Sequence, residues 1–181
     1  LFIRTFAVVC RVPPLVSMCW AALKAPGAAP RAVSSPIERT PSRIVVTLGS
    51  DGRTMSVTDN GRGIPVDAHP KSGKSALEVI LTTLHAGGKF DNDAYKVAGG
   101  LHGVGASVVN ALSSELVATV RRDGAQWEMS FKRGQPAGAL KKIGAARGSG
   151  TTVYFHPDPT IFPKIAFDAQ VIRERLEVVS Y

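Results

Sequence analysis

The sequence is poor in cysteine, lacks a long apolar run and contains no acidic residue before Glu38. Its two cysteines, Cys10 and Cys19, both lie near the N-terminus, and two thiols make neither a disulfide framework nor a zinc site. No apolar run approaches the roughly 20 residues that a membrane-spanning helix needs. We therefore expect a protein of a reducing compartment, the cytoplasm, with no membrane partner.

The composition is otherwise that of an ordinary globular chain with an excess of positive charge. Of its 181 residues, 44% are hydrophobic and 20% are charged, and the length suffices for one domain with a real core. The formal net charge of +8 permits a polyanionic partner such as nucleic acid or a nucleotide. Many basic domains bind neither, so the charge alone does not decide the function.

Residues 1–41 differ in pattern from everything that follows. Alanine, proline and valine dominate this stretch, without the period of a helix or a strand. Its prolines would break any long helix: Pro13, Pro14, Pro26, Pro30, Pro36 and Pro41. A secretory signal is disfavoured because Arg11 and Lys24 interrupt the apolar stretch. We expect residues 1–41 to be an atypical leader, disordered or translated out of frame, and residues 42–181 to be the folded domain.

From Ser42 onward, the pattern predicts strands mixed with helices. Runs rich in β-branched residues predict strands at 43–48, 54–59, 116–121, 127–132 and 151–155. Apolar residues at helical spacing, including Leu77, Ile80, Leu81 and Leu84, predict helices at 75–85, 104–112 and 169–179. Ser75 followed by Glu78 predicts a capping box. Residues 86–100 and 134–150 are predicted to be long connections, and the whole favours an α+β two-layer sandwich.

The segment Asp59–Asn60–Gly61–Arg62–Gly63 follows the second predicted strand and carries a candidate site. An ionised carboxylate accepts hydrogen bonds, so Asp59 could bind an exocyclic amine such as that of adenine. The two glycines would let a flat ring approach the backbone, and the following Ile64 and Pro65 would supply an apolar wall. The alternative is an aspartate that caps an Asn-Gly turn without any ligand.

A second candidate is the glycine cluster AGGLHGVG at 98–105, which runs directly into the predicted helix 104–112. A glycine-rich loop that leads into a helix binds phosphate through backbone N–H groups and the helix N-terminus. The spacing is not that of a Rossmann fingerprint, and Gly73–Lys74–Ser75 lacks the glycine and the strand that a Walker loop requires. Taken alone, the cluster is also compatible with a flexible loop and a helix cap.

The order of the motifs narrows the interpretation: DNGRGIP at 59–65, LHAGGKF at 84–90 and GGLHGVG at 99–105, followed by SVVNALS at 107–113. Over residues 42–181 the chain resembles the ATPase domain of the B subunit of bacterial type II DNA topoisomerases, in the GHKL superfamily. Residues 69–71, 74–80 and 155–158 are more similar to topoisomerase IV than to gyrase. The resemblance implies a two-layer α/β sandwich of the Bergerat type in a bacterial, cytoplasmic isomerase.

The resemblance assigns ATP binding to two groups of residues. Asp59 would bind the adenine amine, directly and through a water that Gly63 and Thr151 surround. A phosphate loop would wrap the phosphates with Gly100, Leu101, His102, Gly103, Val104, Gly105 and Ala106. His102 would position or hydrogen-bond a group there rather than act as the catalytic base.

The resemblance also implies a lid and a rim around the nucleotide. Residues 85–99 would form an ATP lid that is ordered only when nucleotide is bound. Its candidate nucleotide contacts are Tyr95, Lys96 and, with a solvated loop lysine as the alternative, Lys89. Arg62 and Arg122 would rim the pocket on its adenine side, where the family's competitive inhibitors bind.

The chain departs from the family's pattern where the catalytic helix should stand. In the family, a helix before the first matching strand carries a glutamate that activates water and an asparagine that holds Mg²⁺. Residues 22–40 contain three prolines, no asparagine and no acid before Glu38, which lies too close to the strand. We therefore assign no catalytic residue and no metal ligand, and expect a fold that is incomplete at this helix.

An intact family member would use ATP and Mg²⁺ to couple ATP binding and hydrolysis to DNA strand passage, decatenation and relaxation. Its partners would be DNA and a topoisomerase A-type subunit, and it would dimerise through an N-terminal arm that we do not identify in this sequence. The alternative is a catalytically dead, nucleotide-binding remnant. A basic nucleic-acid-binding module is disfavoured because aromatic residues do not alternate with basic ones on the predicted strands.

Overall fold

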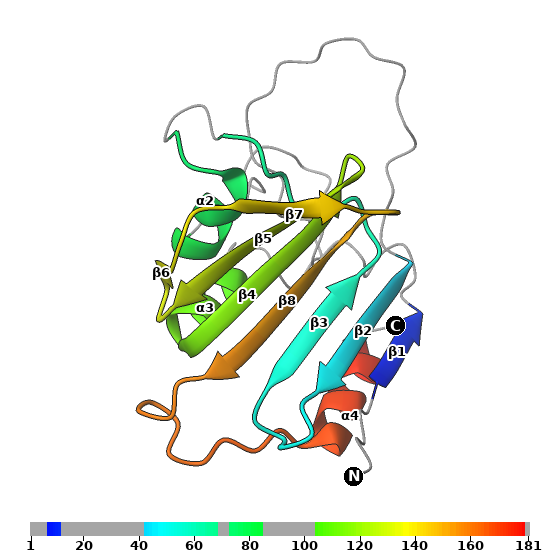
Figure 1. The fold of residues 1–181 in the computed structure, drawn as a ribbon. Coiled ribbons are helices and arrows are strands. Elements are labelled where there is room, and N and C mark those ends of the chain that lie inside the picture. The colour runs from blue at the N-terminus through cyan, green and yellow to red at the C-terminus, as the bar shows by residue number, and fades with distance from the viewer. Residues whose placement is uncertain (1–6, 12–41, 69–72, 85–103, 180–181) are drawn as a thin grey trace, which may run out of the picture.

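The computed structural model describes residues 7–11, 42–68, 73–84 and 104–179. Eight strands form one sheet: β1 Ala7–Arg11, β2 Arg43–Leu48, β3 Met55–Asp59, β4 Ser113–Arg122, β5 Ala125–Lys132, β6 Gln135–Pro136, β7 Lys141–Ala145 and β8 Gly150–Pro157. Within these ranges, three helices accompany it: α2 Ala76–Thr82, α3 Gly105–Ala111 and α4 Ala169–Val179. The strand order is β1-β2-β3-β8-β4-β5-β6, β7 also pairs with β5, and all pairs are antiparallel (Figure 1).

One face of the sheet is apolar because its strands alternate buried and partly exposed residues. Leu116, Ala118 and Val120 of β4 are buried on the face that α2 and α3 cover (Figure 1). The register places Leu116 opposite Phe131 of β5 and Ala118 opposite Met129. Burial of such side chains contributes about 25 cal/mol per Å² of apolar surface, and it fixes the two layers that the sequence predicts.

Helix α2 begins as the sequence predicts but ends earlier. The backbone N–H of Glu78 donates to Ser75 Oγ at 3.1 Å, as a capping box requires, while the Glu78 carboxylate pairs with Lys74 at 2.8 Å. The helix stops before Thr83, whose backbone is extended at φ −115° and ψ 128°. The predicted end at residue 85 is therefore too late, and Leu84, which continues the helical spacing, lies beyond the helix and is 59% exposed. The other three residues of that apolar spacing are buried: Leu77, Ile80 and Leu81.

Three strands lie where the sequence predicts none. β6 and β7 fall within 134–150, so the prediction of a plain connection there is wrong in part. The residues of β7 are all exposed, and such a strand lacks the apolar alternation by which strands are recognised. β1 falls within residues 1–41 and pairs with β2, placing Val9 opposite Val45. An out-of-frame origin for that segment stays a prediction.

Two tight hairpins connect β4 to β5 and β5 to β6. In each, both loop residues have positive φ: Asp123 at 52° with Gly124 at 73°, and Arg133 at 48° with Gly134 at 80°. Positive φ at both positions is the type I′ geometry, which matches the twist of antiparallel strands. The second hairpin lies against α3, since a Cβ on Gly134 would lie 3.2 Å from the Cα of Ala111.

Helix α4 has the bounds that the sequence predicts. Asp168 precedes it, and its Oδ1 accepts hydrogen bonds from the backbone N–H groups of Gln170 at 2.8 Å and Val171 at 3.3 Å, which is the pattern of an N-cap. Within the ranges described above, no helix has the length and apolarity to cross a membrane.

Candidate functional site

Asp59 is a buried carboxylate at the end of β3. The residue is 4% exposed, and its Oδ1 accepts a hydrogen bond from the Gly61 backbone N–H at 2.7 Å. This is the Asx-type turn that the sequence left open as an alternative. Burial of a carboxylate is costly unless hydrogen bonds compensate. The hydrogen bond to Oδ1 fixes the orientation of the whole carboxylate, Oδ2 included. Asp59 can therefore form the turn and still bind a ligand.

Asn60 ties this turn to the neighbouring strand. Its Oδ1 accepts hydrogen bonds from the backbone N–H groups of Ser42 and Arg43, both at 3.0 Å, and its Nδ2 donates to Ser42 Oγ at 3.0 Å. The start of β2 is thereby fixed beside the end of β3. From the sequence, Asn60 was interpreted only as a turn residue, because the partners of its side chain lie far away in the chain.

Gly63 and Thr151 come together with the Asp59 turn, as the resemblance implies. The Ile64 backbone N–H donates to Thr151 Oγ1 at 3.2 Å, and Thr151 is 1% exposed. Gly63 has φ of 78°, and a Cβ there would lie 2.8 Å from the carbonyl oxygen of Arg121. A side chain at position 63 would collide with backbone, so the turn needs glycine.

Gly150, at the start of β8, is a site residue that no sequence motif indicated. A Cβ on it would lie 2.1 Å from the carbonyl oxygen of Asp59 and 3.1 Å from its carbonyl carbon. Its φ of 147° is also one that side chains rarely adopt. The backbones of β3 and β8 therefore touch behind the buried carboxylate, and only glycine permits this contact.

The two arginines predicted at the rim differ in their surroundings. The Nη1 of Arg122 donates to the Gly63 carbonyl at 3.1 Å, and its Nε pairs with the exposed Asp123 at 3.1 Å. Arg62 is exposed. Ile64, predicted as part of an apolar wall, is buried in the core between the sheet and α2, which makes it a packing residue.

Only the end of the predicted phosphate loop lies within the described residues. Val104 is the N-cap position of α3 without a side-chain capping bond, and Ser107 Oγ donates to its carbonyl at 3.0 Å. Among the described residues, none lies within 4 Å of a Cβ on Gly105, so no close contact with them requires glycine there. Outside the described residues lie the lid 85–99 and these candidates: Lys89, Tyr95, Lys96, Gly100, Leu101, His102 and Gly103.

The donor set for a metal ion is not found in the described part of the chain. No group of three or more histidine, cysteine, aspartate or glutamate residues there could hold one. The asparagine that the family uses for Mg²⁺ has no counterpart in residues 22–40 of the sequence. The absence of a metal ligand in this chain stays a prediction.

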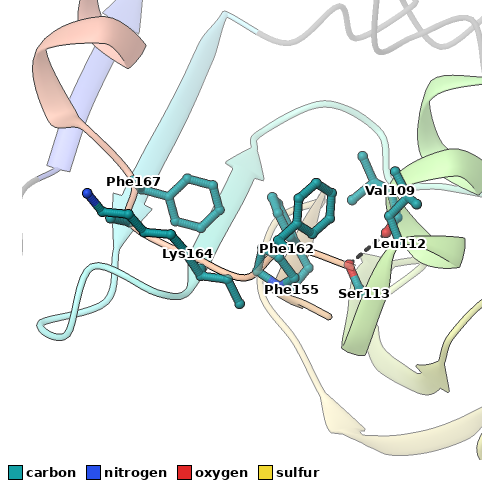
Figure 2. Close-up of a pocket in the computed structure, with 10 residues that line it drawn as sticks. Val109, Leu112, Ser113, Phe155, Phe162, Lys164 and Phe167 are labelled. Carbon is teal, nitrogen blue, oxygen red and sulfur yellow. Dashed lines mark hydrogen bonds between the residues drawn. The ribbon is translucent and has the colours of Figure 1, made fainter. Parts of the chain in front are cut away.

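A separate apolar cavity of about 280 Å³ lies between α3, β8 and the segment 162–167 (Figure 2). Val109, Leu112, Phe155 and Phe162 line it, and the Nζ of Lys164 points away from the other labelled side chains. Few polar groups converge on this cavity. Its lining is unlike that of a nucleotide pocket, which needs polar groups at fixed positions.

An ion pair between the exposed Arg133 and the buried Asp158 lies where β8 ends, at the far end of that strand from the Asp59 turn. Asp158 accepts hydrogen bonds from Nε of the Arg133 guanidinium and from the Thr160 backbone N–H at 2.9 Å. The Arg133 hydrogen bond, helped by Thr160, lowers the pKa of Asp158 from 3.8 to about 2. The Asp158 backbone N–H also donates to the Leu112 carbonyl at 2.9 Å, so β8, the β5–β6 turn and the end of α3 are held together.

The fold and the turn around Asp59 define a class of nucleotide-binding domain. The chain belongs to the family of histidine kinase-, DNA gyrase B- and HSP90-like ATPases, whose family model matches residues 21–161. The antiparallel sheet with helices on one face is accordingly the GHKL ATPase fold. The matched region begins within the segment that we expected to be a leader.

Individual relatives are similar to this chain over most of its length. It is 52% identical over 138 residues to the B subunit of DNA gyrase from Thermotoga maritima, and 55% identical over 142 residues to that from Thermus thermophilus. These alignments cover 76% and 77% of this chain but 22% of each relative, so the chain spans about a fifth of their length.

A solved structure agrees with the sequence comparison. The crystal structure of the 43K ATPase domain of Thermus thermophilus gyrase B in complex with an aminocoumarin superposes with a TM-score of 0.62 and 46% identity. The superposition covers 74% of this chain and 32% of that one. The chain is therefore similar to a gyrase B ATPase domain in both sequence and fold.

Proposed function

We propose that this chain binds ATP at the Asp59 turn and is the nucleotide-binding part of the B subunit of a bacterial type II topoisomerase. The observation that carries the proposal is the buried carboxylate of Asp59, held at the end of β3 by the Gly61 N–H at 2.7 Å. Gly63 and Thr151, which the resemblance associates with an adenine-bound water, lie at the same turn and are joined through Ile64. Family membership supports ATP as the ligand.

Each residue has a distinct role in the proposed pocket. The carboxylate of Asp59 accepts a hydrogen bond from the adenine amine, since an ionised carboxylate is only an acceptor. Thr151 Oγ1 and the backbone of Gly63 orient a water beside it. The segment from Gly100 to Ala106 contacts the phosphates, with Tyr95 and Lys96 approaching from the lid. Arg62 and Arg122 border the adenine side.

Calorimetry with a non-hydrolysable ATP analogue in Mg²⁺ buffer tests the pocket. Asp59→Asn is expected to weaken binding roughly ten- to hundredfold, because a hydrogen bond to a charged group contributes about 1.5–3 kcal/mol. Asp51→Asn is the matched control, since Asp51 is exposed on the β2–β3 turn. If both variants bind as the wild type does, Asp59 does not contact the adenine.

The activity of the whole enzyme is a further proposal. We infer that the complete protein works in the bacterial cytoplasm as a dimer with a topoisomerase A-type subunit, and couples ATP hydrolysis to DNA strand passage. The finer assignment to topoisomerase IV rests on residues 69–71, 74–80 and 155–158, whereas the relatives named above are gyrase subunits. Decatenation without ATP-driven supercoiling by the reconstituted full-length enzyme would support topoisomerase IV, and supercoiling would assign gyrase.

A catalytically dead remnant is the second candidate, and a specific observation favours it. The family match includes residues 21–41, yet this stretch has no asparagine and no acid before Glu38. Without a general base, hydrolysis is slow even where nucleotide binds. We expect weak binding of the analogue at best and, when ATP itself is supplied, almost no phosphate release. Turnover comparable to that of an intact family domain would contradict this, and the encoding DNA would show whether another frame supplies the missing helix.

A further inference from the structure

Asn110, on α3, is a buried polar residue that the site described above does not use. It is 0% exposed, and its Nδ2 donates a hydrogen bond to the Leu81 carbonyl of α2 at 2.9 Å. Its Oδ1 has no hydrogen-bond partner among the described residues. A buried unsatisfied acceptor costs about 1–3 kcal/mol. An asparagine at this position is therefore explained by its bond to Leu81, not by packing.

The carbonyl of Leu81 is one that a helix end leaves without an intrahelical partner. The last four carbonyls of a helix need other donors, and the last turn of α2 carries no basic residue. The backbone N–H of Thr83 donates to Val79 at 2.9 Å, and Thr82 Oγ1 donates to Glu78 at 2.8 Å. Asn110 supplies the donor for Leu81 from a different helix, so it acts as a C-cap of α2.

Helix α3 is a firm support for this cap because its own C-terminal end is attached to the sheet. The Leu112 carbonyl accepts from the Asp158 backbone N–H at 2.9 Å, and the Ser113 carbonyl accepts from that of Arg133 at 2.8 Å. The Asn110 bond thus connects the end of α2 through α3 to the strands. At its other end, α3 begins with Val104–Ala106, which the proposed function assigns to the phosphates.

We propose that Asn110 is a positioning residue of the nucleotide site, which holds the end of α2 at a fixed place relative to the first turn of α3. The inference rests on the proposed function, since it takes Val104–Ala106 as phosphate-contacting residues. The nucleotide does not touch Asn110. Losing its bond to Leu81 lets the two helix ends that flank residues 83–104 move apart, and nucleotide affinity falls.

The charged residues on the elements that pack against α3 either lie on the other face of the sheet from Asn110 or are paired with another residue. On β4, β5 and β8, the charged residues that neighbour buried core positions in the sequence point to the face of the sheet away from α3. They are Glu115, Arg121, Glu128, Lys132 and His156. Elsewhere, Glu78 pairs with Lys74, Arg133 with Asp158, and Arg122 is bound to Gly63 at the far end of β4. A titratable group introduced at position 110 therefore reports its own protonation.

The test compares Asn110→Asp and Asn110→Leu with the wild type in binding of the non-hydrolysable ATP analogue between about pH 6 and 8.5. Burial raises the pKa of the introduced carboxyl, and its protonated form can donate to the Leu81 carbonyl. We expect Asn110→Asp to approach wild-type affinity at the acidic end and to lose about tenfold relative to the wild type at the alkaline end. Asn110→Leu should be weak throughout.

Ser113→Ala is the matched control because it removes a bond at the same C-terminal end of α3 that does not reach α2: Ser113 Oγ donates to the Val109 carbonyl at 2.6 Å (Figure 2). It should lower stability without any pH-dependent change in affinity. Circular dichroism establishes that each variant is folded, and Asn110→Leu is expected to fold because it removes the unsatisfied acceptor.

Amide exchange without nucleotide separates this inference from the proposed function. Asn110→Leu should accelerate exchange at Thr82 and Thr83, and unchanged exchange would overturn the cap. If the wild type does not bind the analogue, the proposed function fails. If it binds and Asn110→Asp follows it at every pH, Asn110 is structural only and the positioning role is wrong.

Discussion

At the scale of single residues, the region around Asp59 depends on two places where a side chain cannot fit. Gly63 faces the Arg121 carbonyl and Gly150 faces the carbonyl of Asp59 itself. Both glycines combine a close backbone contact with a φ that other residues rarely adopt, 78° and 147°. If the backbone contact were relieved but φ stayed the same, or the reverse, a side chain at either position would still be unfavourable.

Gly150→Ala is expected to destabilise the fold because its Cβ would lie 2.1 Å from the Asp59 carbonyl oxygen. Backbone strain alone costs about 1–3 kcal/mol, and the collision adds to it. Urea unfolding measures the change. Gly138→Ala is the control, since nothing lies within 4 Å of a Cβ there. Equal midpoints for the two variants would show that β3 and β8 can separate without cost.

The sequence predicted the polar residues of the site better than the residues that hold them. Asp59 was selected from its motif, Gly63 and Thr151 from the family resemblance, and the structure brings the three residues together at one turn. Gly150 was missed because its contact lies across strands, and the role of Asn60 because its partners are in β2. A local sequence pattern shows the chemical type of a residue. It does not show which backbone from a distant part of the chain will lie against that residue.

At the scale of elements, the first turn of α2 depends on one hydroxyl. Ser75→Ala should lower the free energy of unfolding by about 0.5–2 kcal/mol, because Ser75 Oγ accepts from the Glu78 N–H. Chemical denaturation measures it. Ser50→Ala, in the exposed β2–β3 turn, should change stability little, and a similar loss in both variants would contradict the cap.

Elements with strong patterns were predicted closely, and those without were not. β2 and α4 have the predicted bounds, 43–48 and 169–179. β7 was missed because no face of it is buried, so hydrophobic alternation had no reason to arise. The end of α2 was placed too late because Leu84 continues the apolar spacing, whereas Asn110, which donates to the Leu81 carbonyl near the helix end, lies on α3.

At the scale of the whole molecule, acid should unfold this chain partly through Asp158. Its pKa is lowered to about 2, below that of the unfolded chain. The stabilisation is therefore fully present above about pH 4 and is lost as the pH falls through about 2. Between about pH 4 and 2, the melting temperature of Asp158→Asn should fall less steeply with decreasing pH than that of the wild type. The exposed Asp67→Asn should follow the wild type, and identical slopes in all three proteins would contradict the assignment.

The strand order determines at what stage of synthesis and folding the turn around Asp59 can be completed. β8 lies between β3 and β4, although it comes after every other strand in the described part of the sequence. The Ile64–Thr151 bond joins residues 87 positions apart, and pairing at such separations is slow because the intervening chain must first be closed into a loop. A ribosome-bound chain that ends before residue 150 lacks the backbone that packs behind Asp59. The turn around Asp59 is therefore completed late, after the β8 segment has been synthesised and inserted.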